Sequence, residues 1–203
     1  MIGRVLARYR IVRELGRGGM GTVYEAVHVD LGRKVAIKIL RGEGVVTPEK
    51  MSRFFNEARA ASKVEHRSIV SVMEFSVTDE GYPYIIMEFL AGDSLRDRMR
   101  SRPAEVGRKF LPIVRQIASA LAATHKKQII HRDLKPDNIM LVPDEEAPGG
   151  ERVKLLDFGI AKLASEDEEG GSSVKTRTGQ LLGTPTYMAP EQCRGTEELT
   201  DKV

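Results

Sequence analysis

The sequence predicts an α+β fold of two lobes. A small lobe of five antiparallel strands and one helix is expected at residues 1–88, followed by a mainly helical large lobe at residues 89–203. Two patterns carry this prediction. Apolar residues mostly alternate between residues 9 and 40, as in half-buried strands, whereas after residue 110 they recur every three or four positions, as in a helix with one buried face.

The composition is that of an ordinary globular domain. The chain has 203 residues, 41% of them hydrophobic, and its 32 basic and 29 acidic residues give a net charge of only +3. This balance does not predict a nucleic-acid partner. Cys193 is the only cysteine, which excludes an internal disulfide, and no stretch approaches the roughly 20 apolar residues of a membrane span. We therefore expect a cytoplasmic protein without a membrane segment.

The elements of the small lobe can be placed in order. Three strands joined by tight turns are expected within residues 9–40. Thr47 then supplies a cap for a helix at residues 48–64, which has proline at its first position. Two further apolar runs, at residues 69–77 and 84–89, complete the five-stranded sheet.

The large lobe is expected to begin after a hinge at residues 90–93. Its longest helix should bury one face, and the residues that recur at helical spacing are Leu111, Val114, Ile117, Ala118, Leu121 and Ala122. The polar, glycine-rich pieces 143–150 and 165–173 are predicted to be exposed, mobile loops.

A glycine-rich segment between two of the predicted strands is a candidate phosphate-binding loop. Without side chains, its backbone N–H groups can approach phosphate oxygens closely. A dinucleotide-binding turn is the competing interpretation, but it requires a helix at the last glycine, whereas Thr22 and Val23 continue as a strand. Taken alone, the segment would be an ordinary glycine hairpin. It comprises Leu15, Gly16, Arg17, Gly18, Gly19, Met20 and Gly21.

Lys38 lies among apolar neighbours on a predicted strand, where a lysine without an anionic partner would be costly. It therefore needs a carboxylate and a phosphate. Glu57 is the preferred carboxylate because it lies in the middle of the predicted helix, where it can face the sheet. Glu49 and Glu65, near the helix ends, are the alternatives.

Residues 131–138, with the sequence HRDLKPDN, combine with DFG at residues 157–159 in a pattern that suits phosphoryl transfer from a nucleotide. Asp133 would orient the hydroxyl of the substrate and accept its proton, and Lys135 would neutralise the moving phosphoryl group. Asn138 and Asp157 would hold Mg²⁺, which prefers oxygen ligands. We interpret His131 as a packed residue that braces this loop rather than as a catalytic base.

In these motifs and their order the chain resembles the eukaryotic-type (Hanks-type) serine/threonine protein kinases. The resemblance covers nearly all of residues 9–203, and the glycine loop and the alanine-rich stretch after Glu57 resemble the bacterial branch. The residues that carry it, in chain order, are Gly16, Gly18, Gly21, Lys38, Glu57, Asp133, Lys135, Asn138, Asp157 and the Ala-Pro-Glu motif at residues 189–191.

The resemblance implies ATP and Mg²⁺ as cofactors, with Mn²⁺ as an alternative metal, and protein serine or threonine hydroxyls as the phosphate acceptors. It places Met87 beside the adenine, with the Glu88 carbonyl accepting a hydrogen bond from the base and the Leu90 backbone hydrogen-bonded to the edge of the base. Val23 and Ala36 would cover the face of the adenine. By the same resemblance, the hydroxyl of Thr184 bonds Asp133 and Lys135.

The resemblance also implies regulation by phosphorylation. Arg132, directly before the catalytic acid, can pair with a phosphorylated residue of the activation segment. Thr176 and Thr178 are the candidate autophosphorylation sites, modified in trans within a kinase homodimer.

At its C-terminal end the sequence departs from the pattern of the family. It stops at Val203, a few residues after the Ala-Pro-Glu motif, whereas the family continues with further helices. The large lobe is therefore expected to be truncated, and residues 1–203 alone are expected to show little activity and limited stability. The alternative function is a noncatalytic module that binds nucleotide or scaffolds a partner.

Overall fold

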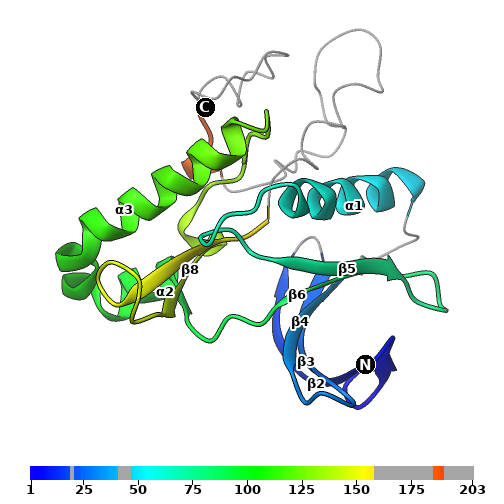
Figure 1. Cartoon of the computed structure of the whole chain (residues 1–203). Helices are drawn as coiled ribbons and strands as arrows, with labels where there is room; N and C mark the ends of the chain where they lie inside the picture. The colour runs from blue at the N-terminus through cyan, green and yellow to red at the C-terminus, as the bar shows by residue number, and fades with distance from the viewer. Residues whose placement is uncertain (19–20, 41–46, 158–184, 190–203) are drawn as a thin grey trace, which may run out of the picture.

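The computed structural model describes residues 1–18, 21–40, 47–157 and 185–189. Its first part is a six-stranded sheet in the order β1-β2-β3-β4-β6-β5, with all neighbours antiparallel. One helix, α1, lies along β5 on one side of this sheet (Figure 1). The elements are β1 (Val5–Leu6), β2 (Tyr9–Gly18), β3 (Gly21–His28), β4 (Lys34–Ile39), α1 (Pro48–Ser62), β5 (Val72–Val77) and β6 (Pro83–Glu88).

The sheet has one strand more than the five predicted. The additional strand is β1, whose residues Val5 and Leu6 pair with Arg10 and Tyr9 of β2. A strand of two residues is too short to show an alternating pattern, so the sequence gives no sign of it. The other strands and α1 lie where they were predicted, with β5 and β6 somewhat shorter than the apolar runs.

The second part contains a three-stranded sheet that the sequence did not predict, in the order β7-β8-β9. Its first strand begins at Asp93, at the end of the predicted hinge. The long helix α3 packs against β9 and appears beside β8 in Figure 1. The elements are β7 (Asp93–Ser94), α2 (Leu95–Ser101), α3 (Pro103–His125), the 3₁₀ turn η1 (Pro136–Asn138), β8 (Ile139–Pro143), β9 (Glu151–Leu155) and the 3₁₀ turn η3 (Pro185–Tyr187).

The start of α1 confirms the predicted cap. The Thr47 side chain accepts a hydrogen bond from the Lys50 amide at 3.3 Å, and Pro48 occupies the first turn, where its missing N–H costs nothing. The helix ends at Ser62, two residues before the predicted end.

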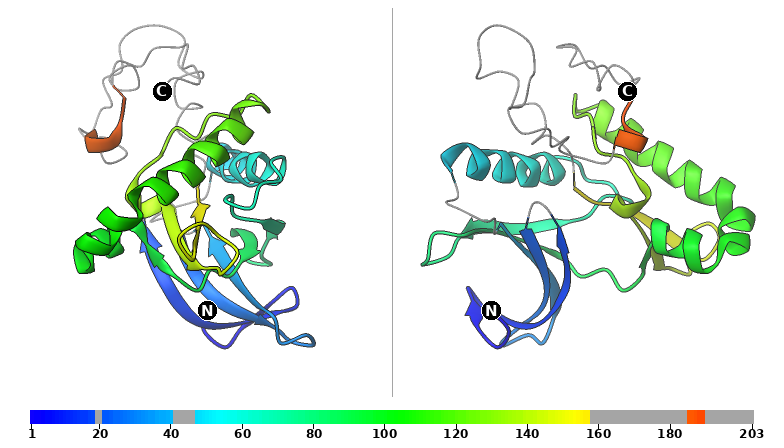
Figure 2. Two further views of the ribbon diagram at one scale, coloured as in Figure 1. Left: turned by 60° about the vertical axis from the view of Figure 1, so that its left-hand side comes forward. Right: turned by 180° about the vertical axis from the view of Figure 1, so that it is seen from behind.

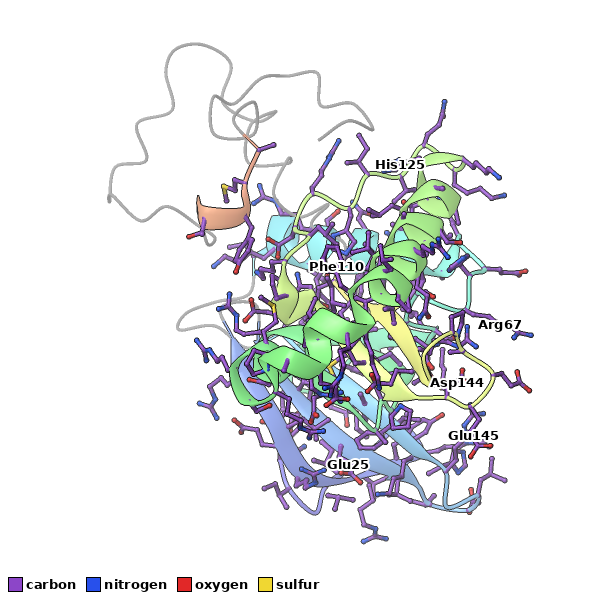
Figure 3. All side chains as sticks on the ribbon, turned by 90° about the vertical axis from the view of Figure 1, so that its left-hand side faces the viewer. Glu25, Arg67, Phe110, His125, Asp144 and Glu145 are labelled. Atoms are coloured by element: carbon purple, nitrogen blue, oxygen red, sulfur yellow. The ribbon has the colours of Figure 1, made fainter. Side chains whose placement is uncertain are left out.

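The buried face of α3 agrees only in part with the predicted one, because Ile117 and Leu121 pack against a hydrophobic cluster as predicted but other predicted residues do not. Ile113, Ala120 and Thr124 are its buried residues, whereas Leu111 is 63% exposed and Val114 is 40% exposed. Figure 3 marks Phe110, a third large exposed side chain of this helix. Apolar residues occur on both sides of α3, so the spacing indicated a helix but could not select the face that packs.

The loop between β8 and β9 makes several contacts of its own. The Asp144 amide donates to the Gly150 carbonyl at 3.1 Å, Arg152 pairs with the Asp144 carboxylate, and Ala147 is buried. Glu145 is exposed and lies with Asp144 at one edge of the molecule (Figure 3). Most of residues 143–150 are exposed, as predicted, and residues 165–173 lie outside the described residues.

Within the part of the chain that the structure describes, buried apolar side chains form three hydrophobic clusters. One lies within the curled strands β2, β3, β4 and β6, whose curvature Figure 2 shows from two sides. A second joins α1 to the sheet through Phe54, Ala58 and Ile85. The third is the largest and combines the end of α1 with α3, β8 and β9. Burial of these apolar surfaces supplies the main driving force for folding.

Backbone bonds also connect the two sheets. The Leu155 amide of β9 donates to the Ser68 carbonyl at 2.8 Å, and the Val70 amide donates to the Leu155 carbonyl at 3.0 Å. Residues 68–70 follow α1 and lead into β5, so the small lobe is bonded directly to the strand that precedes Asp157. Within the described ranges, no helix is both long and apolar enough to cross a bilayer.

Candidate active site

One face of the small-lobe sheet gathers several predicted binding residues. Ala36 and Lys38 are two positions apart on β4 and therefore point to the same side. Directly paired residues share a face, and Val23 of β3 pairs with Lys38 while Met87 of β6 pairs with Ala36. The strand register thus places Val23, Ala36, Lys38 and Met87 on one surface.

Gly21 ends the glycine segment in a conformation that requires glycine. Its φ is +129°, and a Cβ atom there would lie 2.2 Å from the Ile39 carbonyl oxygen. Gly16 and Gly18 have open space where a Cβ would lie, which leaves their backbone accessible to a ligand. Leu15 and Arg17 are exposed on the same strand, and the predicted residues Gly19 and Met20 lie outside the described residues.

Lys38 is buried between two carboxylates. Its Nζ lies 3.5 Å from Glu57 Oε1, the carboxylate predicted on α1, and 2.7 Å from Asp157 Oδ1. Burial alone would lower the pKa of Lys38, but the charges of Asp157 and Glu57 outweigh it and raise the pKa above its ordinary value. Burial raises the pKa of Glu57 to about 8, partly offset by Lys38 and reinforced by Asp157. The ammonium is therefore held charged.

The loop around Asp133 forms a second cluster of polar contacts. Lys135 Nζ donates to Asp133 Oδ2 at 2.8 Å, and Asn138 Nδ2 donates to the same oxygen at 3.0 Å and to the Asp133 carbonyl at 2.9 Å. The turn η1 brings Asn138 back toward Asp133, and Asn138 is itself buried. Two predicted site residues, Lys135 and Asn138, therefore both donate to the carboxylate of a third, Asp133.

His131 packs beneath the surface of this loop as a buried residue. Its ring is buried, its Nε2 lies 2.9 Å from the Leu156 carbonyl oxygen, and burial lowers the pKa of the imidazole. This contact links the Asp133 loop to the segment that carries Asp157. It agrees with the interpretation of His131 as a packed, bracing residue.

Two site residues have left-handed backbone conformations that are unfavourable for side chains with a Cβ. The φ of Arg132 is 61° and that of Asp157 is 44°. Such conformations cost of order 1–3 kcal/mol each and are common at functional sites. These conformations set the direction of the backbone at Arg132, directly before Asp133, and at the predicted metal ligand Asp157.

A small pocket opens where Lys38, Glu57 and Asp157 meet. Its other walls are apolar and come from α1, from β5 with the segment before it, and from β6. They are Ala58, Ala61, Val70, Val72, Ile85 and Met87. The Glu88 carboxylate does not face this pocket but accepts hydrogen bonds from the Ser71 amide and Lys154 Nζ, each at 2.7 Å, and Leu90 is half-buried beyond β6.

Comparison with known proteins decides which family this arrangement represents. The protein kinase domain family matches residues 9–203. The chain belongs to the protein kinase domain family. Its glycine segment, Lys38, the Asp133 loop and Asp157 lie within the matched residues and in the order expected from the resemblance.

Bacterial kinases are among the similar proteins. The kinase domain is 45% identical over 188 residues to serine/threonine-protein kinase pkn2 of Myxococcus xanthus, which covers 93% of the chain and 22% of that protein. It is 40% identical over 192 residues to PrkC of Bacillus subtilis, covering 95% of the chain and 28% of that protein. The chain thus spans only about a quarter of the length of these relatives.

A solved structure agrees with the fold. A crystal structure of a double mutant of the PknI kinase domain of Mycobacterium tuberculosis has a TM-score of 0.71 and 28% identity, covering the whole chain and 72% of the PknI chain. The kinase fold predicted from the sequence is therefore confirmed.

Some predicted residues of this kinase domain cannot be placed. Thr176, Thr178 and Thr184 lie outside the described residues, as do the last two residues of the Ala-Pro-Glu motif. Conversely, the contact between Lys38 and Asp157 was not predicted, because the sequence suggested only a metal-binding role for Asp157. The distance of 119 positions between them hides the contact from any local pattern.

Proposed function

We propose that this kinase domain transfers the γ-phosphoryl group of ATP to serine or threonine hydroxyls of proteins. The observation that carries the proposal is the Asp133 carboxylate, which Lys135 and Asn138 hold in place through Oδ2. A carboxylate fixed in this way can orient a hydroxyl and accept its proton as the oxygen attacks phosphorus. The relatives named as serine/threonine-protein kinases support the choice of acceptor.

The residues present suit ATP and Mg²⁺. Asp157 and Asn138 offer oxygen ligands, and two protein ligands are enough for Mg²⁺, which keeps several waters and binds substrate phosphates. Among the described residues, no cluster of three or more acidic, histidine or cysteine side chains forms a complete metal cage. When bound, Mg²⁺-ATP supplies the phosphoryl group and ADP as the leaving group.

The chain's own residues have separate roles in this proposal. Lys38, held by Glu57, binds the α- and β-phosphates, and Lys135 neutralises charge on the transferred group. Leu15–Gly21 cover the phosphates, while Val23, Ala36, Met87, Glu88 and Leu90 surround the adenine. Thr184 orients Asp133 and Lys135 from the activation segment.

We place the division between the lobes at residues 88 and 89, where β6 ends. The partners are protein substrates and a second kinase domain, which phosphorylates Thr176 and Thr178 in trans. A cytoplasmic location fits the single cysteine of the chain.

The test compares the chain with its Asp133→Asn variant. We expect both to bind Mg²⁺-ATP with equal affinity in calorimetry, because Asp133 is not a phosphate ligand. Phosphate transfer to a serine- and threonine-rich test protein, followed with labelled ATP, should fall by at least about 100-fold in the variant. The exposed turn variant Asp79→Asn is the matched control and should keep full transfer.

Two results would reject the proposal. If the unmodified chain binds Mg²⁺-ATP but transfers no phosphate above the level of Asp133→Asn, the noncatalytic alternative is correct. If it does not bind the nucleotide at all, the kinase function is excluded and only the scaffolding form of the alternative stands.

A further inference from the structure

Arg96 on α2 joins three segments that are far apart in the sequence. Its Nε lies 2.6 Å from Asp137 Oδ1 in the turn η1, and its guanidinium lies 5.7 Å from the centre of the Tyr187 ring in η3. One side chain therefore links α2, the Asp133 loop and the segment that precedes Ala189. The sequence motifs predict no role for Arg96, Asp137 or Tyr187.

The helix that carries Arg96 is firmly held. Ser94 caps it by accepting a hydrogen bond from the Asp97 amide at 3.0 Å, and Leu95 is buried in the largest hydrophobic cluster. Arg98, two residues beyond Arg96, is buried and pairs with Glu151 of β9 at 2.7 Å. Arg96 thus extends from a helix that other residues hold in place.

The chemistry of arginine suits this double contact. The planar guanidinium can donate to a carboxylate at its edge while its face lies on an aromatic ring, which a lysine ammonium cannot reproduce. In this structure the Asp137 carboxylate contacts the edge of the Arg96 guanidinium, which lies over the Tyr187 ring. The side chain of Arg96 is 27% exposed, so the contacts are partly shielded from water.

The contact lies one residue from the reaction centre. Asp137 directly precedes Asn138, whose amide donates to the Asp133 carboxylate at 3.0 Å. Consecutive Cα atoms are about 3.8 Å apart, so Arg96 fixes the Tyr187 segment close to the carboxylate that would receive the hydroxyl. Through Arg96, Asp137 and Asn138, the Tyr187 segment is therefore connected to the Asp133 carboxylate.

We propose that Arg96 is a positioning residue that holds residues 185–187 against the Asp133 loop and thereby builds the docking surface for a polypeptide substrate. The proposal rests on the proposed function. Arg96 acts through Asp137 and Tyr187, so its loss should weaken peptide binding more than phosphoryl transfer itself. ATP binding should not change, because Lys38 and its partners are on other elements.

The kinetic test uses Arg96→Ala, Arg96→Lys and the control Arg100→Ala, an exposed arginine on the same helix. For a serine- or threonine-containing peptide, Arg96→Ala should raise KM by about 5- to 10-fold. This is the change expected from losing the binding free energy of one partly exposed ion pair and one cation–π contact. Its kcat and its KM for ATP should stay within about twofold of the parent. Arg96→Lys should recover only part of the loss, and Arg100→Ala should behave as the parent chain.

A structural readout that needs no turnover accompanies the kinetics. Hydrogen exchange of a peptide covering residues 185–189 should become faster in Arg96→Ala but not in Arg100→Ala. Tyr187→Leu should reproduce the faster exchange and the higher KM, and the double variant with Arg96→Ala should add little, because the two residues act as one unit. Equal thermal unfolding midpoints would show that the variants are folded.

The outcomes separate the two proposals. Unchanged exchange at residues 185–189 in Arg96→Ala, or equal losses in kcat with no change in peptide KM, would overturn the role of Arg96. If the parent chain transfers no phosphate, the proposed function fails and the docking role fails with it, whatever the exchange shows about the contact.

Discussion

Lys38 and Arg98 are two equally buried cations, each with a side chain only 6% exposed, but their surroundings differ. Arg98 meets three carboxylates, those of Glu151, Asp93 and Glu105, at 2.7, 3.1 and 3.2 Å. Lys38 meets two, those of Glu57 and Asp157, and each cluster contains one partly exposed acid, Asp157 at 42% and Asp93 at 45%. Arg98 joins the acids of β7, α3 and β9, whereas Lys38 lines a pocket.

The Arg98 cluster is also balanced by a second cation. Lys109 contacts Glu151 at 2.9 Å and Glu105 at 3.3 Å. Burial opposes ionisation of Glu151, but the hydrogen bonds from Lys109 and Arg98 outweigh it and lower the pKa of this carboxyl. In the Lys38 cluster, by contrast, the pKa of Glu57 is raised. Burial and pairing alone therefore do not mark a reaction site, whereas an incompletely neutralised acid beside a pocket does.

The largest stability effect should come from Arg98→Met. Removal of this guanidinium leaves Glu151 partly unpaired in the interior, and breaking a buried pair typically costs about 3–5 kcal/mol of unfolding free energy. Urea denaturation measures the loss. Lys109→Met is the control, because Lys109 is 32% exposed and its loss should cost no more than about 1 kcal/mol. Similar losses in the two variants would show that Arg98 is no more enclosed than Lys109.

Lys38→Met should act on function more than on stability. The fold can tolerate the change because Glu57 already has a pKa of about 8 and can take up a proton, and because Asp157 is partly exposed. We expect less than half of the stability loss of Arg98→Met. Phosphate transfer should fall by about 100- to 1,000-fold, the typical result of removing one charge contact at a reaction centre. A stability loss equal to that of Arg98→Met would contradict the comparison.

His131 should give the smallest effect, visible as a pH dependence. Burial lowers its pKa below the ordinary 6.5, so the unfolded chain takes up a proton near pH 6 that the folded chain does not. The free energy of unfolding should therefore decrease as the pH falls below 6.5, by at most about 1.4 kcal/mol per pH unit. His131→Asn removes this titration, and urea unfolding between pH 5 and 7.5 should show a smaller slope than in the parent chain. Equal slopes would refute a neutral, buried His131.

Local patterns predicted much of the fold and the partner of Lys38. Thr47 and Pro48 mark the start of α1 by their own chemistry, and Glu57 was preferred because the middle of a helix can face the sheet. Glu57 does lie within 3.5 Å of Lys38. These inferences needed only short segments and the physical properties of their residues.

Contacts that depend on the assembled chain could not be predicted. Arg96 looks like one of several arginines on a basic helix, and only the fold brings it to Asp137 and Tyr187. On α3, Ile117 and Leu121 were placed correctly on the packed face, but Leu111 was not, because Leu111 and Ile113 are equally apolar and their neighbours in space decide which is buried. Local pattern cannot supply that information.

The bonds between Leu155 and residues 68–70 have a consequence for how the molecule unfolds. They join the two sheets through the backbone, and the largest hydrophobic cluster combines the end of α1 with α3, β8 and β9. Neither sheet can separate without exposing part of the other's core, so the described elements should unfold as one cooperative unit rather than as two independent domains.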